Sequence, residues 1–368
     1  MKEGITAAGK IILGLIGALL LLAVLASGYF VVANKLTKSD VSDYASRTGA
    51  DYNTGIHGAI YIPSDAYNAW QMYEKYDEAE IDRDLGYAES IGLNAIRVFT
   101  SYEYWLEEPE QFFSKFEHLI TCAWQHGIRL LPVLFEDCGV DNTEEARKAD
   151  TDETGFCVCS PERAVQKNRD RYGEVDGYID AFMERYGNDE RLLAIEVMNE
   201  PHILSGNIGF AKYALKRVRA FGGSVPLSMG QLTIFHNLLF AGRLDIYQYH
   251  DNYPSSEIRL ILEMTLGNFF RNLTGRPHWL TEWQRVRLSG GGWGKAEIPE
   301  SDKTPDLASL AGVIREYEVC DFFWSLMVKE AYLPTQRLNG TFNGLFYPDG
   351  SVYSEADREA VALPGADS

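Results

Sequence analysis

Short apolar runs alternate with longer amphipathic stretches along most of the chain, starting at His57. A bounded apolar run of about four to eight residues is typical of a buried strand, whereas apolar residues spaced about three or four apart are typical of a helix. The apolar runs predict strands at His57–Tyr61, Asn94–Phe99, Arg129–Phe135, Leu193–Met198, Pro226–Met229, Leu244–Tyr249, His278–Thr281 and Phe322–Leu326. The amphipathic stretches between them predict helices at Glu78–Ile91, Pro109–His126, Val175–Tyr186, Phe210–Phe221, Ile234–Ala241, Ser256–Leu273 and Asp306–Tyr317.

Strands that are each separated from the next by a helix indicate parallel β–α units. Eight such units over about 310 residues fit an α/β protein of the (β/α)8 class, a TIM barrel, with the surplus residues in its loops. A doubly wound open sheet is the alternative. It typically has a glycine-rich phosphate-binding turn after an early strand, and the sequence has none there.

The N-terminus carries an uncharged apolar stretch of 23 residues, Ile11–Ala33. At a rise of about 1.5 Å per residue, a helix of this length can cross a hydrocarbon core of about 30 Å. Lys2 and Lys10 favour a cytoplasmic location for the end before the span. A signal peptide cleaved after Val24–Ala26 is the alternative. We favour the uncleaved anchor because the apolar run continues past that site.

Both interpretations place the rest of the chain across the membrane, either as the extracellular part of a membrane protein or as a secreted protein. Residues 1–36 are predicted to be a cytoplasmic stub plus transmembrane anchor, or a signal peptide. Residues 37–54 are polar and weakly patterned, which predicts a short stalk. Residues 55–368 are predicted to form the barrel domain.

The composition narrows the classes of partner. The 34 basic and 53 acidic side chains give a formal net charge of −19 and a pI near 4.8, which argues against nucleic acid as a partner. Five cysteines are too few for a disulfide scaffold. Cys138, Cys157 and Cys159 fall in one loop region and would form a disulfide only in an oxidising compartment. Cys157 and Cys159 lack the spacing of a zinc knuckle, so no metal is predicted.

Two glutamates follow predicted strands directly. Glu200 comes after the fourth strand, as part of Asn199-Glu200-Pro201, and Glu282 comes after the seventh. In a (β/α)8 barrel the catalytic groups lie at the C-terminal ends of the strands, so these two carboxyl groups are expected to face each other. A proton-donating carboxyl group opposite a nucleophilic carboxylate is the equipment of glycoside hydrolysis.

The segment Ile195–Pro201 resembles the Asn-Glu-Pro signature of glycoside hydrolase family 5, one of the clan A β-glycanase barrels. The resemblance extends from His57 to about Ala362. It implies a retaining glycosidase that cleaves β-glycosidic bonds of a β-glucan or β-mannan by double displacement. Glu200 would be the general acid/base and Glu282 the nucleophile, with no metal or other cofactor.

The same resemblance suggests supporting residues. Arg97 matches the family's second-strand arginine, which binds the nucleophile, and His250 matches its sixth-strand histidine. Trp324 matches the aromatic floor under the reacting sugar, and Asn199 would hold the sugar 2-hydroxyl. An arginine beside Glu282 favours the ionised carboxylate that a nucleophile requires.

Two departures from the family pattern leave alternatives open. The family usually carries His-x-Tyr on the sixth strand, whereas Tyr253 stands one position later here, so its role as a partner of Glu282 is open. After the third strand, Glu136-Asp137 replaces a histidine-bearing pattern. Glu136 or Asp137 either binds a sugar hydroxyl or caps the loop.

Long loops are expected to form the substrate-binding groove, namely Cys138–Arg171 and the glycine-rich Val286–Pro305. Trp293 lies in the second of these and is a candidate for stacking on a sugar. The aromatic residues that follow the first two strands are further candidates, with ordinary packing as the alternative: Tyr61, Tyr102, Tyr104 and Trp105.

The sequence therefore predicts a monomeric, membrane-tethered or secreted glycosidase acting on a β-linked oligosaccharide or polysaccharide. The alternative is a catalytically silent carbohydrate-binding barrel at the cell surface.

Overall fold

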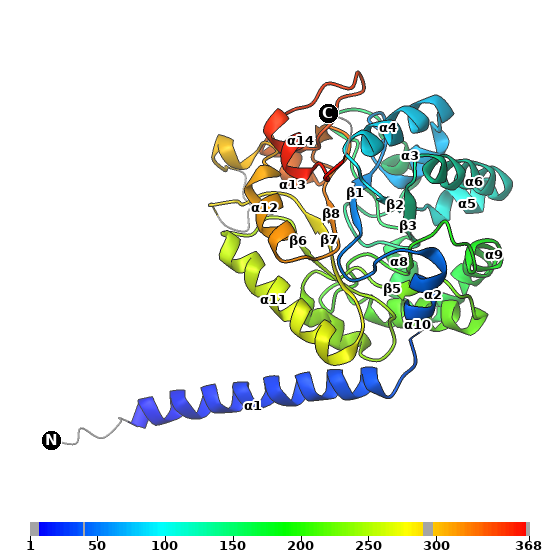
Figure 1. The fold of residues 1–368 in the computed structure, drawn as a ribbon. Coiled ribbons are helices and arrows are strands. Elements are labelled where there is room, and N and C mark those ends of the chain that lie inside the picture. The colour runs from blue at the N-terminus through cyan, green and yellow to red at the C-terminus, as the bar shows by residue number, and fades with distance from the viewer. Residues whose placement is uncertain (1–6, 40, 290–296, 366–368) are drawn as a thin grey trace.

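The computed structural model describes residues 7–39, 41–289 and 297–365. Within them, eight parallel strands form one sheet in the order β5-β4-β3-β2-β1-β8-β7-β6, surrounded by helices (Figure 1). The strands are β1 (His57–Tyr61), β2 (Ala95–Phe99), β3 (Arg129–Val133), β4 (Ile195–Glu196), β5 (Leu227–Ser228), β6 (Tyr247–Asp251), β7 (His278–Trp283) and β8 (Asp321–Phe323).

Backbone hydrogen bonds also join the two end strands of this order. The Ile246 N–H donates to the Leu227 carbonyl at 3.2 Å, and the His250 N–H donates to the Gln231 carbonyl at 2.9 Å. The sheet thus closes on itself, and the predicted (β/α)8 barrel is confirmed.

The helices that the amphipathic pattern predicts are all present. They are α4 (Glu78–Ser90), α6 (Pro109–Gln125), α9 (Asp176–Tyr186), α10 (Ile208–Phe221), α11 (Glu257–Thr274) and α12 (Ala308–Glu316), while Ile234–Phe240 forms the 3₁₀ helix η2. Local signals set their ends. The Asp77 carboxylate accepts the Ala79 and Glu80 N–H groups at the start of α4, and Gly275, at φ 73°, ends α11 in the left-handed region.

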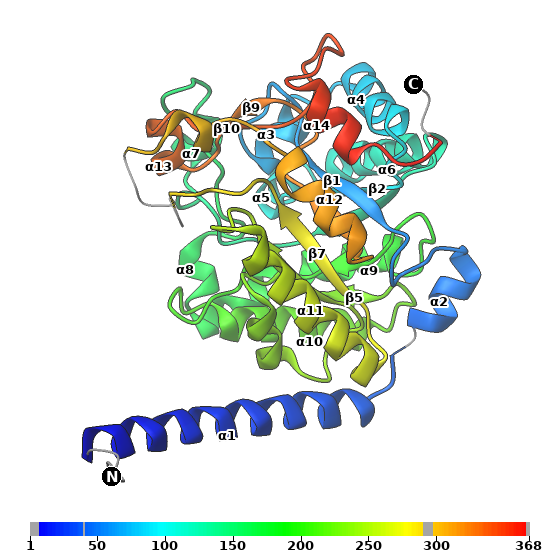
Figure 2. The same ribbon diagram turned by 60° about the vertical axis from the view of Figure 1, so that its left-hand side comes forward.

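The loops at the C-terminal ends of the strands contain shorter elements that periodicity does not predict. These are α3 (Ala69–Glu74) after β1, α5 (Tyr102–Glu107) after β2, α7 (Glu144–Lys148), α8 (Arg163–Gln166) and η1 (Arg169–Val175) after β3, η4 (Glu300–Asp302) after β7, and β9 (Lys329–Glu330), α13 (Pro334–Leu338) and β10 (Phe342–Asn343) after β8. The helix α14 (Glu355–Val361) completes the outer layer (Figure 2).

The N-terminal helix α1 (Ala7–Lys35) projects from the barrel as a long straight helix (Figures 1 and 2). By length and composition, its segment Ile12–Lys35 could cross a membrane or act as a signal sequence. Its last turns pack on the barrel. The Phe30 ring is 2% exposed and lies 4.8 Å from the Tyr247 ring and 5.1 Å from the Phe270 ring, centroid to centroid.

The segment 37–54, expected to be a stalk, is attached to the barrel through a few buried side chains. It contains α2 (Val41–Thr48), and its two tyrosines are buried. The Tyr44 hydroxyl donates to the Leu192 carbonyl at 2.8 Å, and the Tyr52 hydroxyl donates to the Leu193 carbonyl at 2.6 Å. These bonds hold the segment against the residues just before β4.

Candidate active site

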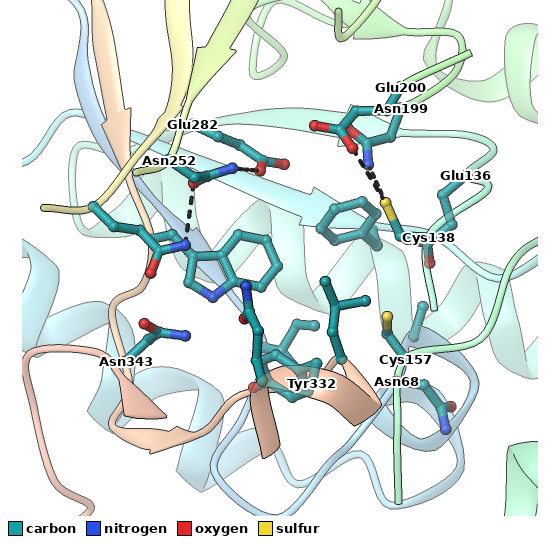
Figure 3. Close-up of a pocket in the computed structure, with 17 residues that line it drawn as sticks. Asn68, Glu136, Cys138, Cys157, Asn199, Glu200, Asn252, Glu282, Tyr332 and Asn343 are labelled. Carbon is teal, nitrogen blue, oxygen red and sulfur yellow. Dashed lines mark hydrogen bonds between the residues drawn. The ribbon is translucent and has the colours of Figure 1, made fainter. Parts of the chain in front are cut away.

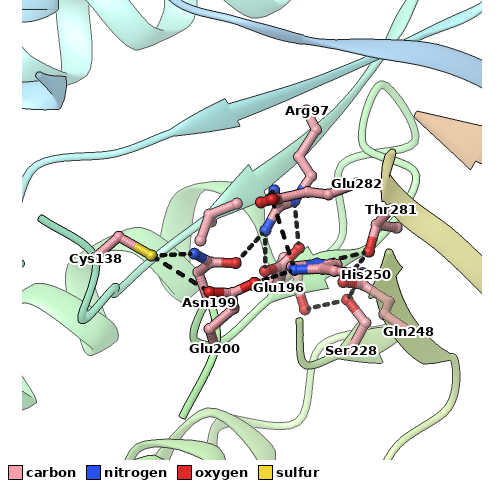
Figure 4. Close-up of polar contacts among 12 residues, drawn as sticks. Arg97, Cys138, Glu196, Asn199, Glu200, Ser228, Gln248, His250, Thr281 and Glu282 are labelled. Carbon is pink, nitrogen blue, oxygen red and sulfur yellow. Dashed lines mark hydrogen bonds and ion pairs between the residues drawn. The ribbon is translucent and has the colours of Figure 1, made fainter. Parts of the chain in front are cut away.

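Glu200 and Glu282 meet at the mouth of the barrel, at the C-terminal ends of β4 and β7 (Figure 4). One carboxylate oxygen from each lies within 4.8 Å of the other, and a ring nitrogen of His250 lies within the same distance of both. The structure therefore brings together the two carboxyl groups that the sequence singled out.

Arg97 on β2 ties several of these side chains together. Its Nε and Nη2 atoms donate to both oxygens of Glu196 at 2.8 and 2.6 Å, and its Nη1 atom donates to Glu282 Oε1 at 2.6 Å. A further bond runs from Nη2 to Asn199 Oδ1 at 2.7 Å. Arg97 and Glu196 are both fully buried, so the pair is a fixed part of the barrel interior. A Cβ on Gly230 would overlap Glu196, so this site requires glycine.

Glu196 is a site residue that sequence reasoning missed. Its position within an apolar strand, an even number of residues before Glu200, was the available signal, because alternate strand residues face the same side. A carboxylate buried inside a barrel needs a cationic partner, and Arg97 supplies it.

The surroundings of Glu282 favour its ionised form. Burial raises the pKa of Glu282, but the positive charges of His250 and Arg97 outweigh that effect, and the net shift is downward. The Asn252 amide also donates to Glu282 Oε2 at 2.8 Å. Both oxygens of this carboxylate thus accept hydrogen bonds from the protein.

Glu200 has different neighbours. The His250 Nδ1 atom lies 2.7 Å from Glu200 Oε1, and the Cys138 thiol donates to Glu200 Oε2 at 3.6 Å. Burial lowers the pKa of His250, but the charges of Glu282 and Glu200 outweigh it, so the net shift is upward. Glu200 itself has a φ of 47°, a left-handed conformation that is rare for non-glycine residues and occurs at functional sites.

A cavity opens in front of the two glutamates (Figure 3). Its lining includes Asn199, Phe99 and Trp324, whose half-buried indole lies 6.4 Å from the Phe99 ring, centroid to centroid. An indole beside two carboxyl groups provides a flat apolar surface for a sugar ring.

No family model matches the sequence, and neither does any curated protein. Solved structures do match. An exo-β-1,4-mannosidase from Opitutaceae bacterium strain TAV5 aligns with a TM-score of 0.58 and 16% identity over 85% of this chain and 60% of its own. An endo-β-1,4-mannanase from Thermotoga petrophila aligns with a TM-score of 0.56 and 12% identity over 86% of this chain and 77% of its own. A GH5_18 structure from Streptomyces cattleya in complex with GlcNAc aligns with a TM-score of 0.54 and 14% identity, over 83% and 79% of the two chains.

The chain has the barrel fold of glycoside hydrolase family 5. At these identities the likeness concerns the fold, which confirms that part of the resemblance. The chain spans only about 60% of the length of the mannosidase.

The sequence left open whether Tyr253 is a partner of Glu282, and the contacts around Glu282 bear on that question. Asn252, not Tyr253, contacts Glu282, and it stands where the family's His-x-Tyr places its tyrosine. The Tyr253 ring packs under the Arg287 guanidinium at 3.7 Å, and its hydroxyl lies 3.5 Å from Asn343 Oδ1. Tyr253 therefore helps to hold the loop behind the site.

Two of the candidate sugar-binding residues, Tyr61 and Asp137, have other partners in the structure. Tyr61 is fully buried, and its hydroxyl donates to Asp84 Oδ2 at 3.0 Å. Asp137 accepts the Arg163 Nε–H at 2.8 Å, a contact within its own loop. Trp293 lies outside the described residues.

Other aromatic candidates also serve packing. Tyr102 and Tyr104 are buried, and the Trp105 ring stacks on Tyr102 with centroids 6.2 Å apart. Glu136, by contrast, does line the cavity. Burial raises its pKa well above the usual range, so we expect a neutral carboxyl group that can both donate to and accept from a hydroxyl.

The five cysteines are all free thiols. Cys138 and Cys157 line the cavity. No disulfide joins Cys138, Cys157 and Cys159 in the loop after β3. Cys122 lies away from the site, in a cluster with Asp82 and His126 whose ligand atoms lie within 4.8 Å of one another.

Glu200, His250 and Glu282 also have spacing that would allow them to share a cation. Both Glu282 oxygens already accept N–H groups, from Arg97 and Asn252, so a cation would have to compete with these donors. The donor set therefore fits proton transfer and nucleophilic attack better than metal binding. That the site uses no metal or other cofactor stays a prediction.

Proposed function

We propose that the protein is a retaining glycoside hydrolase that cleaves β-glycosidic bonds by double displacement. The observation that carries this proposal is the separation of the two carboxylates, whose nearest oxygens lie within 4.8 Å. Retaining glycosidases hold their carboxyl groups about 5–5.5 Å apart, whereas inverting enzymes separate them by roughly 6.5–9.5 Å to admit a water molecule.

In the first step, a Glu282 oxygen attacks the anomeric carbon of a sugar seated on Trp324. The bond from that carbon to the leaving oxygen breaks, and the leaving oxygen takes the proton of Glu200. In the second step, a water molecule gives a proton to Glu200 and attacks the same carbon, which breaks the bond to Glu282. Both glutamates return to their starting forms.

The polar network prepares each glutamate for its part. Arg97 and Asn252 keep Glu282 ionised and fix its orientation. The Thr281 hydroxyl donates to Gln248, so it accepts from His250 Nε2 at 3.1 Å, and His250 carries a proton on that nitrogen. Its Nδ1 atom can then accept a hydrogen bond from the protonated Glu200, and it donates one to the ionised Glu200 when His250 itself is protonated.

The substrate we propose is a β-glucan or β-mannan type saccharide. The matched structures include a mannosidase, a mannanase and an endoglucanase, and the pocket offers an aromatic face with amide and carboxyl groups. We further propose that a monomer acts outside the cell, with α1 as its membrane anchor or, before cleavage, as a signal peptide.

The test is hydrolysis of aryl β-mannosides and β-glucosides by the full-length chain, with the configuration of the first product read by proton NMR. We expect the β anomer first. Glu282→Gln should abolish turnover, while Glu110→Gln, a matched change at an exposed position of α6, should not alter it. Initial release of the α anomer would refute the retaining mechanism. Absence of hydrolysis on all aryl glycosides would favour the silent sugar-binding barrel.

A further inference from the structure

Three loops form a wall on one side of the cavity. They follow β1, β3 and β8, and they contribute Asn68, Cys157, Tyr332, Leu333 and Gln336 to the lining. Figure 3 shows Glu200 and Glu282 along one side of the pocket and Tyr332, Cys157 and Asn68 along the other. The wall therefore lies across the cavity from the glutamates.

Polar bonds hold these loops to one another. The bonds run from Lys329 Nζ to the Ala66 carbonyl (2.8 Å), from the Cys157 N–H to the Tyr332 carbonyl (3.1 Å), from Gln71 Nε2 to the Arg147 carbonyl (2.8 Å) and from Arg337 Nη2 to the Gly155 carbonyl (3.1 Å). Each bond joins loops that follow different strands. The wall is thus a single cross-linked body, not three independent loops.

The chemistry of the two glutamates sets the direction in which a substrate lies. The general acid must reach the oxygen of the leaving group, so the leaving group lies on the Glu200 side of the reacting sugar. The other end of that sugar, its non-reducing end, then points away from Glu200, and the wall is the part of the lining that lies across the cavity from Glu200. An internal residue of a polymer would have to continue through the wall.

Two buried polar atoms in the pocket lining lack a hydrogen-bond partner among the described residues. They are Gln336 Nε2 and Gln284 Oε1, and both side chains are 3% exposed. An unpaired buried donor or acceptor is costly, and in a binding site it marks a place for a ligand group. The terminal sugar of a chain carries a free hydroxyl where an internal sugar carries the next linkage, and it can supply that group.

We infer that the enzyme is exo-acting and removes one sugar at a time from the non-reducing end of a β-linked saccharide. Gln336 and Gln284 bind hydroxyls of the terminal sugar, and the cross-linked wall excludes a preceding one. This inference rests on the proposed glycosidase function. It adds that the substrate is the free non-reducing end of a saccharide chain.

The decisive test uses one oligosaccharide, of the mannan or the glucan series, whichever is hydrolysed faster. It compares the free oligosaccharide with a form that carries a methyl ether at the 4-hydroxyl of the non-reducing end. We expect release of single sugars from the free form and about a 10⁴-fold lower kcat/KM for the blocked form, as for sites built around a hydroxyl. Equal cleavage of both forms into mixed lengths would overturn the inference but leave the glycosidase function intact. Loss of activity on aryl glycosides as well would instead overturn the glycosidase function.

A variant then tests the wall. Gln336→Ala should lower kcat/KM for the free oligosaccharide about 10-fold, mainly through KM, because one hydrogen bond to the terminal sugar is lost. Gln111→Ala, at an exposed position of α6, is the matched control and should change neither constant. An unchanged KM in a correctly folded Gln336→Ala enzyme would remove this residue from chain-end binding.

Discussion

Asn252 offers the sharpest test of how the site prepares Glu282, the proposed nucleophile. Its amide donates to Glu282 Oε2 at 2.8 Å, and Gln284 Nε2 donates in turn to the Asn252 oxygen at 3.2 Å, which fixes the orientation of the amide. In Asn252→Ala this donor is lost while Arg97 still contacts the other oxygen of Glu282. The carboxylate should become less ordered and easier to protonate.

The size of the effect follows from the kind of bond. A hydrogen bond to a charged group is worth about 2 kcal/mol, which corresponds to about a 30-fold lower kcat/KM. The bond lowers the pKa of Glu282, so its loss should raise that pKa. Because the reaction needs the ionised carboxylate, the acidic limb of the pH–rate profile should move to higher pH.

The assay is the pH dependence of kcat/KM on an aryl β-glycoside. Asn252→Asp should be more damaging than Asn252→Ala, because it places a second negative charge beside Glu282. Asn53→Ala, at an exposed position before β1, serves as the control. An Asn252→Ala enzyme with an unchanged acidic limb and unchanged kcat/KM would refute the argument that this amide holds the nucleophile.

Four further outcomes are expected. Glu282→Ala should lose turnover by several orders of magnitude and regain it with azide, giving a product of opposite anomeric configuration. Glu200→Ala should still release dinitrophenol from an activated glycoside in a burst. The reverse pattern in the two variants would exchange the roles of the two glutamates. Gly230→Ala should give little folded protein or an inactive one by circular dichroism and assay, because its Cβ would overlap Glu196 and lie 3.2 Å from Arg97 Nη2. Tyr52→Phe should leave the Leu193 carbonyl unpaired and cost about 1–3 kcal/mol in urea unfolding, whereas an unchanged midpoint would show that the contact contributes nothing. The full-length protein should remain in the membrane fraction through carbonate washes, and recovery of a soluble form that starts near Ser27 would identify a signal peptide instead.

The sequence contained enough information for the barrel and its two glutamates. Apolar runs and amphipathic stretches are local signals, so they located the strands and helices within a few residues. The barrel rule then placed Glu200 and Glu282 at the same end. The sequence did not identify Asn252 as the residue after β6 that contacts Glu282. The pairing of β6 with β7 shifts register between Tyr249 and His250, and such an irregularity changes which side chain faces the site.

Other features depend on contacts between distant segments. Tyr44 and Tyr52 looked like parts of a polar stalk because their carbonyl partners lie about 140 residues later in the chain. The wall of the pocket likewise arises from bonds between loops after β1, β3 and β8, and no local pattern records such bonds. The packing of residues 37–54 and the wall of the pocket therefore both depend on tertiary contacts.

The join between α1 and the barrel also determines how far the proposed glycosidase can reach. Phe30 and Asn34 are held by the barrel, Asn34 through the Tyr247 hydroxyl at 2.6 Å, whereas the residues from Ile12 to Leu25 of the same helix are exposed. At 1.5 Å per residue those 14 residues measure about 21 Å, about two thirds of one hydrocarbon core. If this helix stays in a membrane, no flexible linker separates the membrane from the barrel.

The contact is made at Tyr247 and His278, the first residues of β6 and β7, whereas the glutamates lie at the opposite ends of the strands. The catalytic mouth would then stay at one fixed height and orientation above the lipid. Such an enzyme processes the saccharides that arrive at its own cell surface and cannot follow a polymer away from it.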